Sequence, residues 1–127
     1  SATASVDSER LVLVLEDEAD VRQTLCEQLH QLGYLTLEAD NGEQALNMLE
    51  ASPDIGMFIS DLMLPGSLSG AEVINHVRSH YPQLPVLLIS GQDLRPAHNP
   101  QLPDVPLLRK PFTRVQLAQA LRKVMVI

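Results

Sequence analysis

Three acidic residues in this sequence stand where short apolar runs stop. Glu16 and Asp17 follow RLVLVL, and Asp61 follows IGMFIS. Two carboxylates about 4 Å apart repel by roughly 4 kcal/mol at an effective dielectric constant near 20, so three that meet need protonation, separation or a cation. Carboxylates, a backbone carbonyl and water suit Mg²⁺ or Mn²⁺ rather than zinc. The sequence therefore predicts a divalent-cation site, provided that the fold brings these residues together.

A serine and a lysine occupy comparable positions in the chain. Ser90 ends the apolar run PVLLIS, and Lys110 follows VPLLR. An aspartate such as Asp61 can attack phosphorus because carboxylates form acyl phosphates, while a metal ion and a lysine neutralise the charge on the transferred group. These residue types together indicate phosphoryl transfer to an aspartate.

Alternating strands and helices would have to position these side chains. Apolar runs rich in leucine and β-branched residues predict five strands, at 10–15, 34–38, 55–60, 85–90 and 105–108. Apolar residues at helical spacing predict helices that begin near Asp20, Asn41, Gly70 and Thr113. Ser69 with Glu72, and Thr113 with Gln116, have the spacing of a capping box.

The alternation of strand and helix predicts an α/β fold in which a five-stranded parallel sheet carries helices on both faces, since right-handed crossovers return each strand in the same direction. We expect a doubly wound sheet with the flavodoxin-like order 2-1-3-4-5. In that order strands one and three are neighbours, and Glu16, Asp17 and Asp61 converge at the carboxyl ends of the strands. The stretch 92–106 contains four prolines, so the fourth helix is predicted to be reduced or irregular.

Composition and charge narrow the class of protein. With 127 residues, 45% hydrophobic and 20% charged, the chain is predicted to form one domain over 10–127, after a disordered lead or linker at 1–9. A net charge of −7 disfavours direct binding of nucleic acid, because the phosphate backbone would be repelled. One cysteine, no start like a signal peptide and no apolar run of spanning length predict a cytoplasmic domain without membrane insertion.

Four motifs, LVLEDE, ISDLMLPG, LLISG and RKPF, resemble in order and spacing those of bacterial response regulator receiver domains, over residues 10–124. The resemblance implies that Asp61 is the site of phosphorylation. The residues that it implies as ligands of Mg²⁺, with Mn²⁺ as a substitute, are Glu16, Asp17, Asp61 and the backbone carbonyl of Met63. The residues that it implies as contacts of the phosphoryl oxygens are Ser90 and Lys110. The Lys110-Pro111 bond resembles the cis peptide of the family.

The same resemblance implies partners and a reaction. A histidine kinase or a histidine phosphotransfer domain would supply the phosphoryl group, and a protein-interaction surface would switch in response. The domain is expected to catalyse its own phosphorylation and dephosphorylation, with no external substrate. The loop PGSLSG is one residue longer than the common form, and with the 1–9 lead and the RKPF tail it favours the carboxyl-terminal receiver of a hybrid sensor kinase, whose full-length chain would be a kinase. No motif indicates an oligomeric state.

Two departures from the family pattern favour an alternative function, a phosphorylation-independent docking module with a vestigial acidic pocket. Leu107 stands where the family usually has the aromatic residue of its rotameric switch, and the stretch 92–106 replaces much of the fourth helix. Met63 and Gln92 flank the path that the family pattern gives to the hydrolytic water. Because Met63 offers this water no good hydrogen bond, dephosphorylation is predicted to be slow to moderate.

Other candidate sites have weaker signals. His76 and His80 lie four residues apart on an expected helix, but without an evident third ligand we interpret them as an exposed helix border. Cys26 is interpreted as a residue of a helical core or its boundary, since no basic neighbour or CxxC pattern accompanies it. A flavodoxin-like FMN protein is disfavoured because EDEAD would repel a phosphate. An aspartate-nucleophile phosphatase would need a second aspartate where Met63 stands.

Overall fold

Five parallel strands form a single sheet in the computed structural model, which describes residues 11–62, 64, 68–91 and 105–125. The strands are β1 (Leu11–Leu15), β2 (Leu35–Ala39), β3 (Met57–Asp61), β4 (Val86–Ser90) and β5 (Leu107–Arg109). The helices of the described residues are α2 (Ala19–Gln31), α3 (Gly42–Ala51), α4 (Gly70–His80) and α5 (Arg114–Met125). The strand order β2-β1-β3-β4-β5 confirms the doubly wound fold predicted from the sequence.

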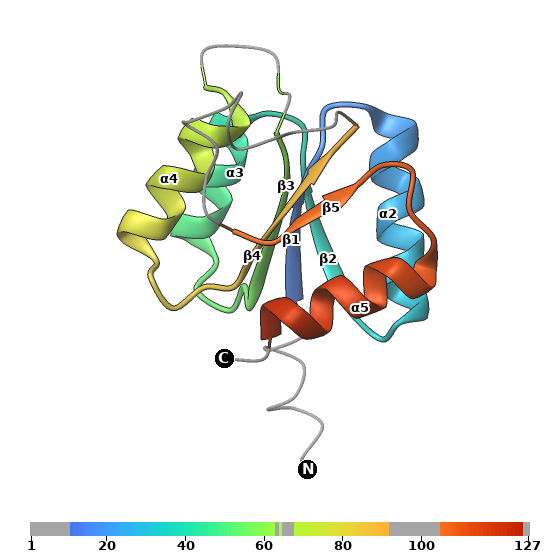
Figure 1. Ribbon diagram of the computed structural model, residues 1–127. Coiled ribbons are helices and arrows are strands. Elements are labelled where there is room, and N and C mark those ends of the chain that lie inside the picture. The colour runs from blue at the N-terminus through green and yellow to red at the C-terminus, as the bar shows by residue number, and fades with distance from the viewer. Residues whose placement is uncertain (1–10, 63, 65–67, 92–104, 126–127) are drawn as a thin grey trace.

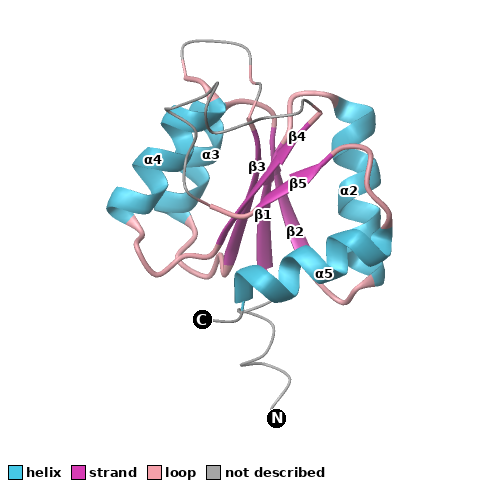
Figure 2. Cartoon of the chain, viewed as in Figure 1, coloured by secondary structure: helices cyan, strands magenta, loops and turns pink. Residues whose placement is uncertain are grey.

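The sheet is the middle layer of three, with α3 and α4 on one face and α2 and α5 on the other (Figures 1 and 2). Neighbouring residues of the central strands enter separate cores: Leu13 and Phe58 pack with α3 and α4, whereas Val14 and Ile59 pack with α2 and α5. Each fully buried side chain of this size stabilises the fold by about 1.5–3 kcal/mol. The strands lack polar alternation because both of their faces are covered.

The helices begin where local signals predict. The hydroxyl of Ser69 accepts a hydrogen bond from the Glu72 amide at 3.1 Å, and the Glu72 carboxylate accepts one from the Ser69 amide at 3.1 Å. Thr113 and Gln116 form the second reciprocal pair, at 2.8 and 3.1 Å. Gly33, at the end of α2, has a φ of 95°, which a residue without Cβ adopts readily. The two reciprocal pairs, and not Gly33, start α4 and α5 at the edge of the sheet where the acidic residues lie.

Strand boundaries differ from the predicted ones by one or two residues. The third strand begins at Met57 and not at residue 55, because the Ile55 amide bonds the Ser52 carbonyl in a turn and the Gly56 amide is taken by the Leu11 carbonyl. It ends at Asp61, which pairs in register with Ile89. The last strand is shifted likewise, to Leu107–Arg109.

Some predictions concern residues outside the described part of the chain. These are the 1–9 lead, the ligand carbonyl of Met63, the position of Gln92 and most of the 92–106 stretch. They therefore stay predictions. Among the helices that the structure describes, none combines the length and the apolar character that a membrane span requires.

Candidate functional site

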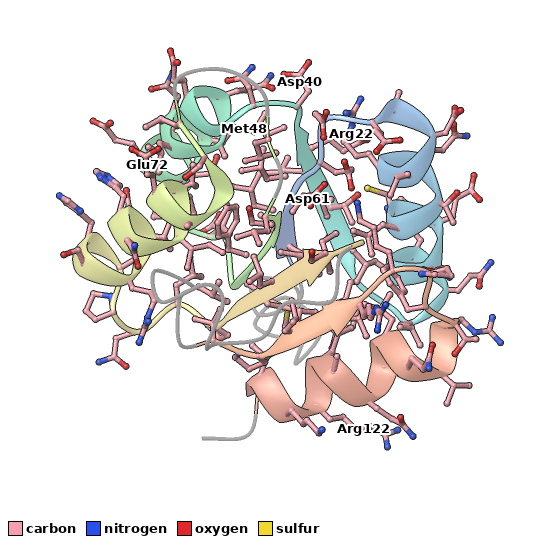
Figure 3. The ribbon with its side chains drawn as sticks, turned by 45° about the horizontal axis from the view of Figure 1, so that its top comes forward. Arg22, Asp40, Met48, Asp61, Glu72 and Arg122 are labelled. Atoms are coloured by element: carbon pink, nitrogen blue, oxygen red, sulfur yellow. The ribbon has the colours of Figure 1, made fainter. Side chains whose placement is uncertain are left out.

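The carboxyl ends of the strands form one edge of the sheet, and this edge gathers the polar residues singled out from the sequence. Asp61 is the last residue of β3, Ser90 is the last residue of β4, and Glu16 and Lys110 follow β1 and β5 directly. Figure 3 shows Asp61 at this edge, with Arg22 of α2 at the same edge. Because parallel strands end together, side chains far apart in sequence become neighbours here.

Three carboxylates converge at this edge. Glu16, Asp17 and Asp61 each offer an oxygen, and these oxygens lie within 4.8 Å of one another. Glu16 is fully buried and Asp61 is 4% exposed, whereas Asp17 is half-buried. They are the only group of three or more potential metal ligands of the His, Cys, Asp and Glu types among the described residues. Such a cluster costs free energy unless a proton or a cation compensates its charge.

Lys110 supplies part of that compensation. Its Nζ donates to Glu16 Oε1 at 2.5 Å and to Asp61 Oδ2 at 3.0 Å. The Lys110 amide donates to the Ser90 carbonyl at 2.7 Å, which fixes the backbone of Lys110 beside the end of β4. The Lys110-Pro111 peptide is cis, as predicted. Burial lowers the pKa of Lys110, but the hydrogen bonds to the two carboxylates outweigh burial and raise it above the usual value. The lysine therefore stays charged between its partners.

The three carboxylates together carry more negative charge than Lys110 alone can compensate. Burial, reinforced by the charge of Asp61, raises the pKa of Glu16 to about 7, against the lowering effect of the hydrogen bonds from Lys110 and from the Glu18 amide. A buried carboxyl group that holds its proton near neutrality is one for which a divalent cation can compete. The donor set, oxygen atoms from three carboxylates, matches Mg²⁺ and Mn²⁺ in kind. The residues present thus fit a hard divalent cation.

The structure describes five of the six residues predicted for the site and places all five at this edge of the sheet. Glu16, Asp17, Asp61 and Lys110 share the cluster, and Ser90, fully buried, ends the strand beside β3. The sixth, Met63, lies outside the described residues.

Sequence reasoning missed two residues that support this edge. A Cβ on Gly70 would lie within 3.0 Å of the backbone carbonyls of Asp61 and Leu62, so α4 packs directly on the chain that follows the site. Arg22 contacts the backbone of Glu16 and the side chain of Glu38. No local pattern could reveal either contact, because each depends on residues brought close only by the fold.

The histidine pair and the cysteine lie away from this cluster. His76 and His80 are exposed on α4, with ring centroids 3.9 Å apart, and His80 Nδ1 lies 3.0 Å from the His76 carbonyl oxygen. Cys26 is 4% exposed in the core between α2 and the sheet, and burial raises the pKa of its thiol. The predicted core position of Cys26 is confirmed.

Comparison with known proteins gives one consistent result. A sequence model described as "Response regulator receiver domain" matches residues 12–122. The phosphate regulon transcriptional regulatory protein PhoB of Escherichia coli K12 is 32% identical over 121 residues, which cover 91% of this chain and 52% of PhoB. A cyclic di-GMP phosphodiesterase of Thermotoga maritima is 34% identical over 82 residues, 65% of this chain and 21% of that protein. The chain thus spans about half or less of these curated relatives.

Solved structures agree with the sequence relatives. The chemotaxis protein CheY4 of Vibrio cholerae superposes with a TM-score of 0.80 at 26% identity, over 91% of this chain and 98% of CheY4. The receiver domain from the hybrid histidine kinase CckA superposes with a TM-score of 0.74 at 31% identity, again over 91% and 98% of the two chains.

Proposed function

Because this chain belongs to the response regulator receiver domain family of two-component systems, we propose that Asp61 is its phosphoacceptor and that phosphorylation switches a protein-interaction surface. The observation that carries the proposal is the buried contact of Lys110 with both Glu16 and Asp61, inside a cluster of three carboxylates. A structural ion pair would not require a third acid at the same place. An acceptor site for a phosphoryl group requires both a carboxylate nucleophile and compensating positive charge.

Asp61 is the nucleophile in this proposal. A carboxylate oxygen of Asp61 attacks the phosphorus of a phosphohistidine, a P–O bond forms, the P–N bond breaks, and the electron pair returns to the imidazole nitrogen, which takes up a proton. The Lys110 ammonium neutralises negative charge on the oxygens of the transferred group. The Ser90 hydroxyl, at the end of the neighbouring strand, would donate a hydrogen bond to one of these oxygens.

Glu16, Asp17 and Asp61 would hold Mg²⁺, or Mn²⁺ in its place, together with the carbonyl of Met63. When bound, the ion would supply positive charge that helps Lys110 to neutralise the oxygens of the phosphoryl group. The protein residues have a separate role, because they keep the nucleophile Asp61 buried and oriented.

The proposed donor is a histidine kinase or a histidine phosphotransfer domain. A groove of about 300 Å³ runs beside Lys110, lined by apolar side chains that include Val21, Leu25, Pro111 and Phe112. It offers the donor an apolar contact next to the acceptor. We further propose a receiver spanning 10–127 behind a lead at 1–9, located in the cytoplasm as part of a larger protein. The likeness to the CckA receiver favours a hybrid sensor kinase as that protein.

Phosphorylation by a small donor tests the assignment of Asp61. Incubation with Mg²⁺ and acetyl phosphate is expected to add one phosphate, measured by intact mass, and Asp61→Asn is expected to add none. The matched control is Asp54→Asn, an exposed aspartate in the turn before β3, which should be phosphorylated like the parent. Equal phosphate uptake by Asp61→Asn and the parent would refute the proposal.

One observation favours the second candidate, a phosphorylation-independent docking module. Leu107 replaces the usual aromatic residue and is 39% exposed on β5, so no ring can move between buried and exposed positions there. If partner affinity is the same with and without beryllofluoride, a phosphate mimic, this candidate is correct. A change in affinity supports the switch.

A further inference from the structure

Arg22, in the first turns of α2, connects three elements near the acidic cluster. Its Nη1 donates to the carbonyl oxygen of Glu16 at 2.7 Å, and its Nε donates to Glu38 Oε1, on β2, at 3.0 Å. Its own amide donates to the Glu18 carbonyl at 2.9 Å. Figure 3 shows Arg22 at the same edge of the sheet as Asp61. One guanidinium therefore ties α2 and β2 to the loop that follows β1.

The carbonyl that Arg22 contacts lies just beyond the end of β1. The Glu16 amide still donates to the Ala39 carbonyl of β2, at 3.1 Å. The strand ends at Leu15, and the Glu16 carbonyl accepts from the Arg22 side chain instead. Both backbone groups of Glu16 are thus held, one by a strand and the other by Arg22.

That carbonyl belongs to the peptide unit that joins Glu16 to Asp17. A peptide unit is planar, so holding its oxygen also fixes the direction of the Asp17 amide and restricts the position of the Asp17 Cα. Without Arg22 the unit can rotate, and the Asp17 carboxylate then no longer faces Asp61 in one fixed arrangement. Such a rotation would therefore disturb the arrangement of the carboxylate oxygens that are proposed to bind the cation. The Glu16 carboxylate keeps its bonds to Lys110 and to the Glu18 amide.

We propose that Arg22 is a positioning residue for the divalent-cation site, holding the Glu16–Asp17 peptide so that the Asp17 carboxylate stays directed at the cluster. The inference rests on the proposed function, since it assumes that the cluster binds Mg²⁺. Glu38 orients the guanidinium from the other side. Substitution of residues that orient metal ligands typically weakens metal affinity by 10–100-fold.

A purely structural ion pair between α2 and β2 is the competing explanation. The Arg22 side chain is 19% exposed and that of Glu38 is 52% exposed, and pairs this accessible add little to folding stability. That explanation predicts a small loss of thermal stability for Arg22→Met and for Glu38→Gln alike. It predicts no change in Mg²⁺ affinity.

Titration of the metal-free chain with MgCl₂, followed by backbone amide NMR shifts, separates the two explanations. Arg22→Met should raise the Kd for Mg²⁺ about tenfold and shift the Asp17 amide resonance before metal is added. Arg22→Lys, which can reach the carbonyl but lacks the fork that also binds Glu38, should show a smaller increase. The control is Arg114→Met, which removes an arginine hydrogen bond of 2.7 Å to Gln31 between α5 and α2 and should leave the Kd unchanged.

An Arg22→Met chain that binds Mg²⁺ as tightly as the parent overturns the inference and leaves the proposed function intact. A parent chain that binds no Mg²⁺ overturns the proposed function and the inference with it. If Arg22→Met folds poorly, Arg22→Ala decides, since it also removes the donor to the Glu16 carbonyl and alanine is the residue most favourable to a helix. A raised Kd with unchanged thermal unfolding supports positioning, and an unchanged Kd refutes it.

Discussion

The two edges of the sheet differ in what they bury. All buried polar residues of the described chain, namely Glu16, Ser60, Asp61 and Ser90, lie at the carboxyl ends of β1, β3 and β4. The opposite edge, formed by the amino ends of the strands and here called the amino edge, has a hollow of about 420 Å³, compared with about 300 Å³ for the groove beside Lys110. The residues that line this hollow include Leu49, Ile55, Tyr81, Pro82 and Leu84. The described residues that line it include no carboxylate. Buried charge, and not volume, marks the functional edge.

This contrast has an energetic reason. Burying a carboxylate costs free energy that only specific partners offset, so a fold retains such groups where they serve a function. An apolar hollow between Pro-rich turns, such as the one at the amino edge, costs far less. Each prediction that follows changes a residue at one of the two edges.

Removal of the Lys110 charge should have the largest effect. Lys110→Met leaves Glu16 and Asp61 facing each other without their ammonium, and breaking a buried pair from one side costs about 3–5 kcal/mol. We expect a loss of about 3 kcal/mol in the unfolding free energy of the metal-free chain at pH 8, measured by urea denaturation. Arg78→Met, an exposed change in the last turn of α4 beside the amino edge, should cost less than about 0.5 kcal/mol. If Lys110→Met and Arg78→Met lose the same unfolding free energy, the proposed difference between the two edges of the sheet is wrong.

The protonation of Glu16 should make stability depend on pH. The pKa of Glu16 is about 7 in the folded chain and 4.5 without the fold. The folded state therefore binds more protons between these values, and the Glu16 contribution to stability falls as pH rises from 4.5 to 7. The fall amounts to about 3 kcal/mol at most. Glu16→Gln should lack this fall. The measurement is the unfolding free energy of the parent and of Glu16→Gln by urea denaturation at several pH values. If the two free energies change in parallel with pH, the prediction is wrong.

Gly70→Ala should disturb the site through the backbone. The new methyl group would meet the carbonyls of Asp61 and Leu62, which cannot move aside as a flexible side chain can. Overpacking of this kind costs about 1–3 kcal/mol, and the displaced Asp61 should also accept phosphate more slowly from acetyl phosphate. Gly91 is the matched control at the same edge, since a Cβ there meets nothing within 4 Å. If Gly91→Ala lowers stability and phosphorylation as much as Gly70→Ala does, close packing against Asp61 and Leu62 does not explain why residue 70 is a glycine.

Apolar spacing and capping pairs in the sequence predicted the strands and helices. The acidic residues at the ends of the predicted strands predicted the carboxylate cluster. The Ser69–Glu72 spacing, for instance, fixes the start of α4 because the capping groups are three residues apart. The close approach of Gly70 to Asp61 could not be predicted, since it depends on how α4 packs on the sheet. The bond of Arg22 to Glu38 spans 16 positions and two elements, so no local pattern contains it. The sequence therefore predicted the side chains that meet at the strand ends, but not Gly70 and Arg22, which pack against and bond the backbone there.

The smallest effect is expected for a substitution at the amino edge. This substitution tests whether one carboxylate in a hollow is enough to bind Mg²⁺. Gln83 is exposed and lines the 420 Å³ hollow. Gln83→Glu places a charge there without Lys110 or a second acid, in contact with water that solvates it. Its stability should change by less than about 0.5 kcal/mol, and its Mg²⁺ titration should match that of the parent. New Mg²⁺ binding at this position would mean that a single acid at a concave surface suffices. The burial and the shared ammonium of Glu16 and Asp61 would then not distinguish the carboxyl edge.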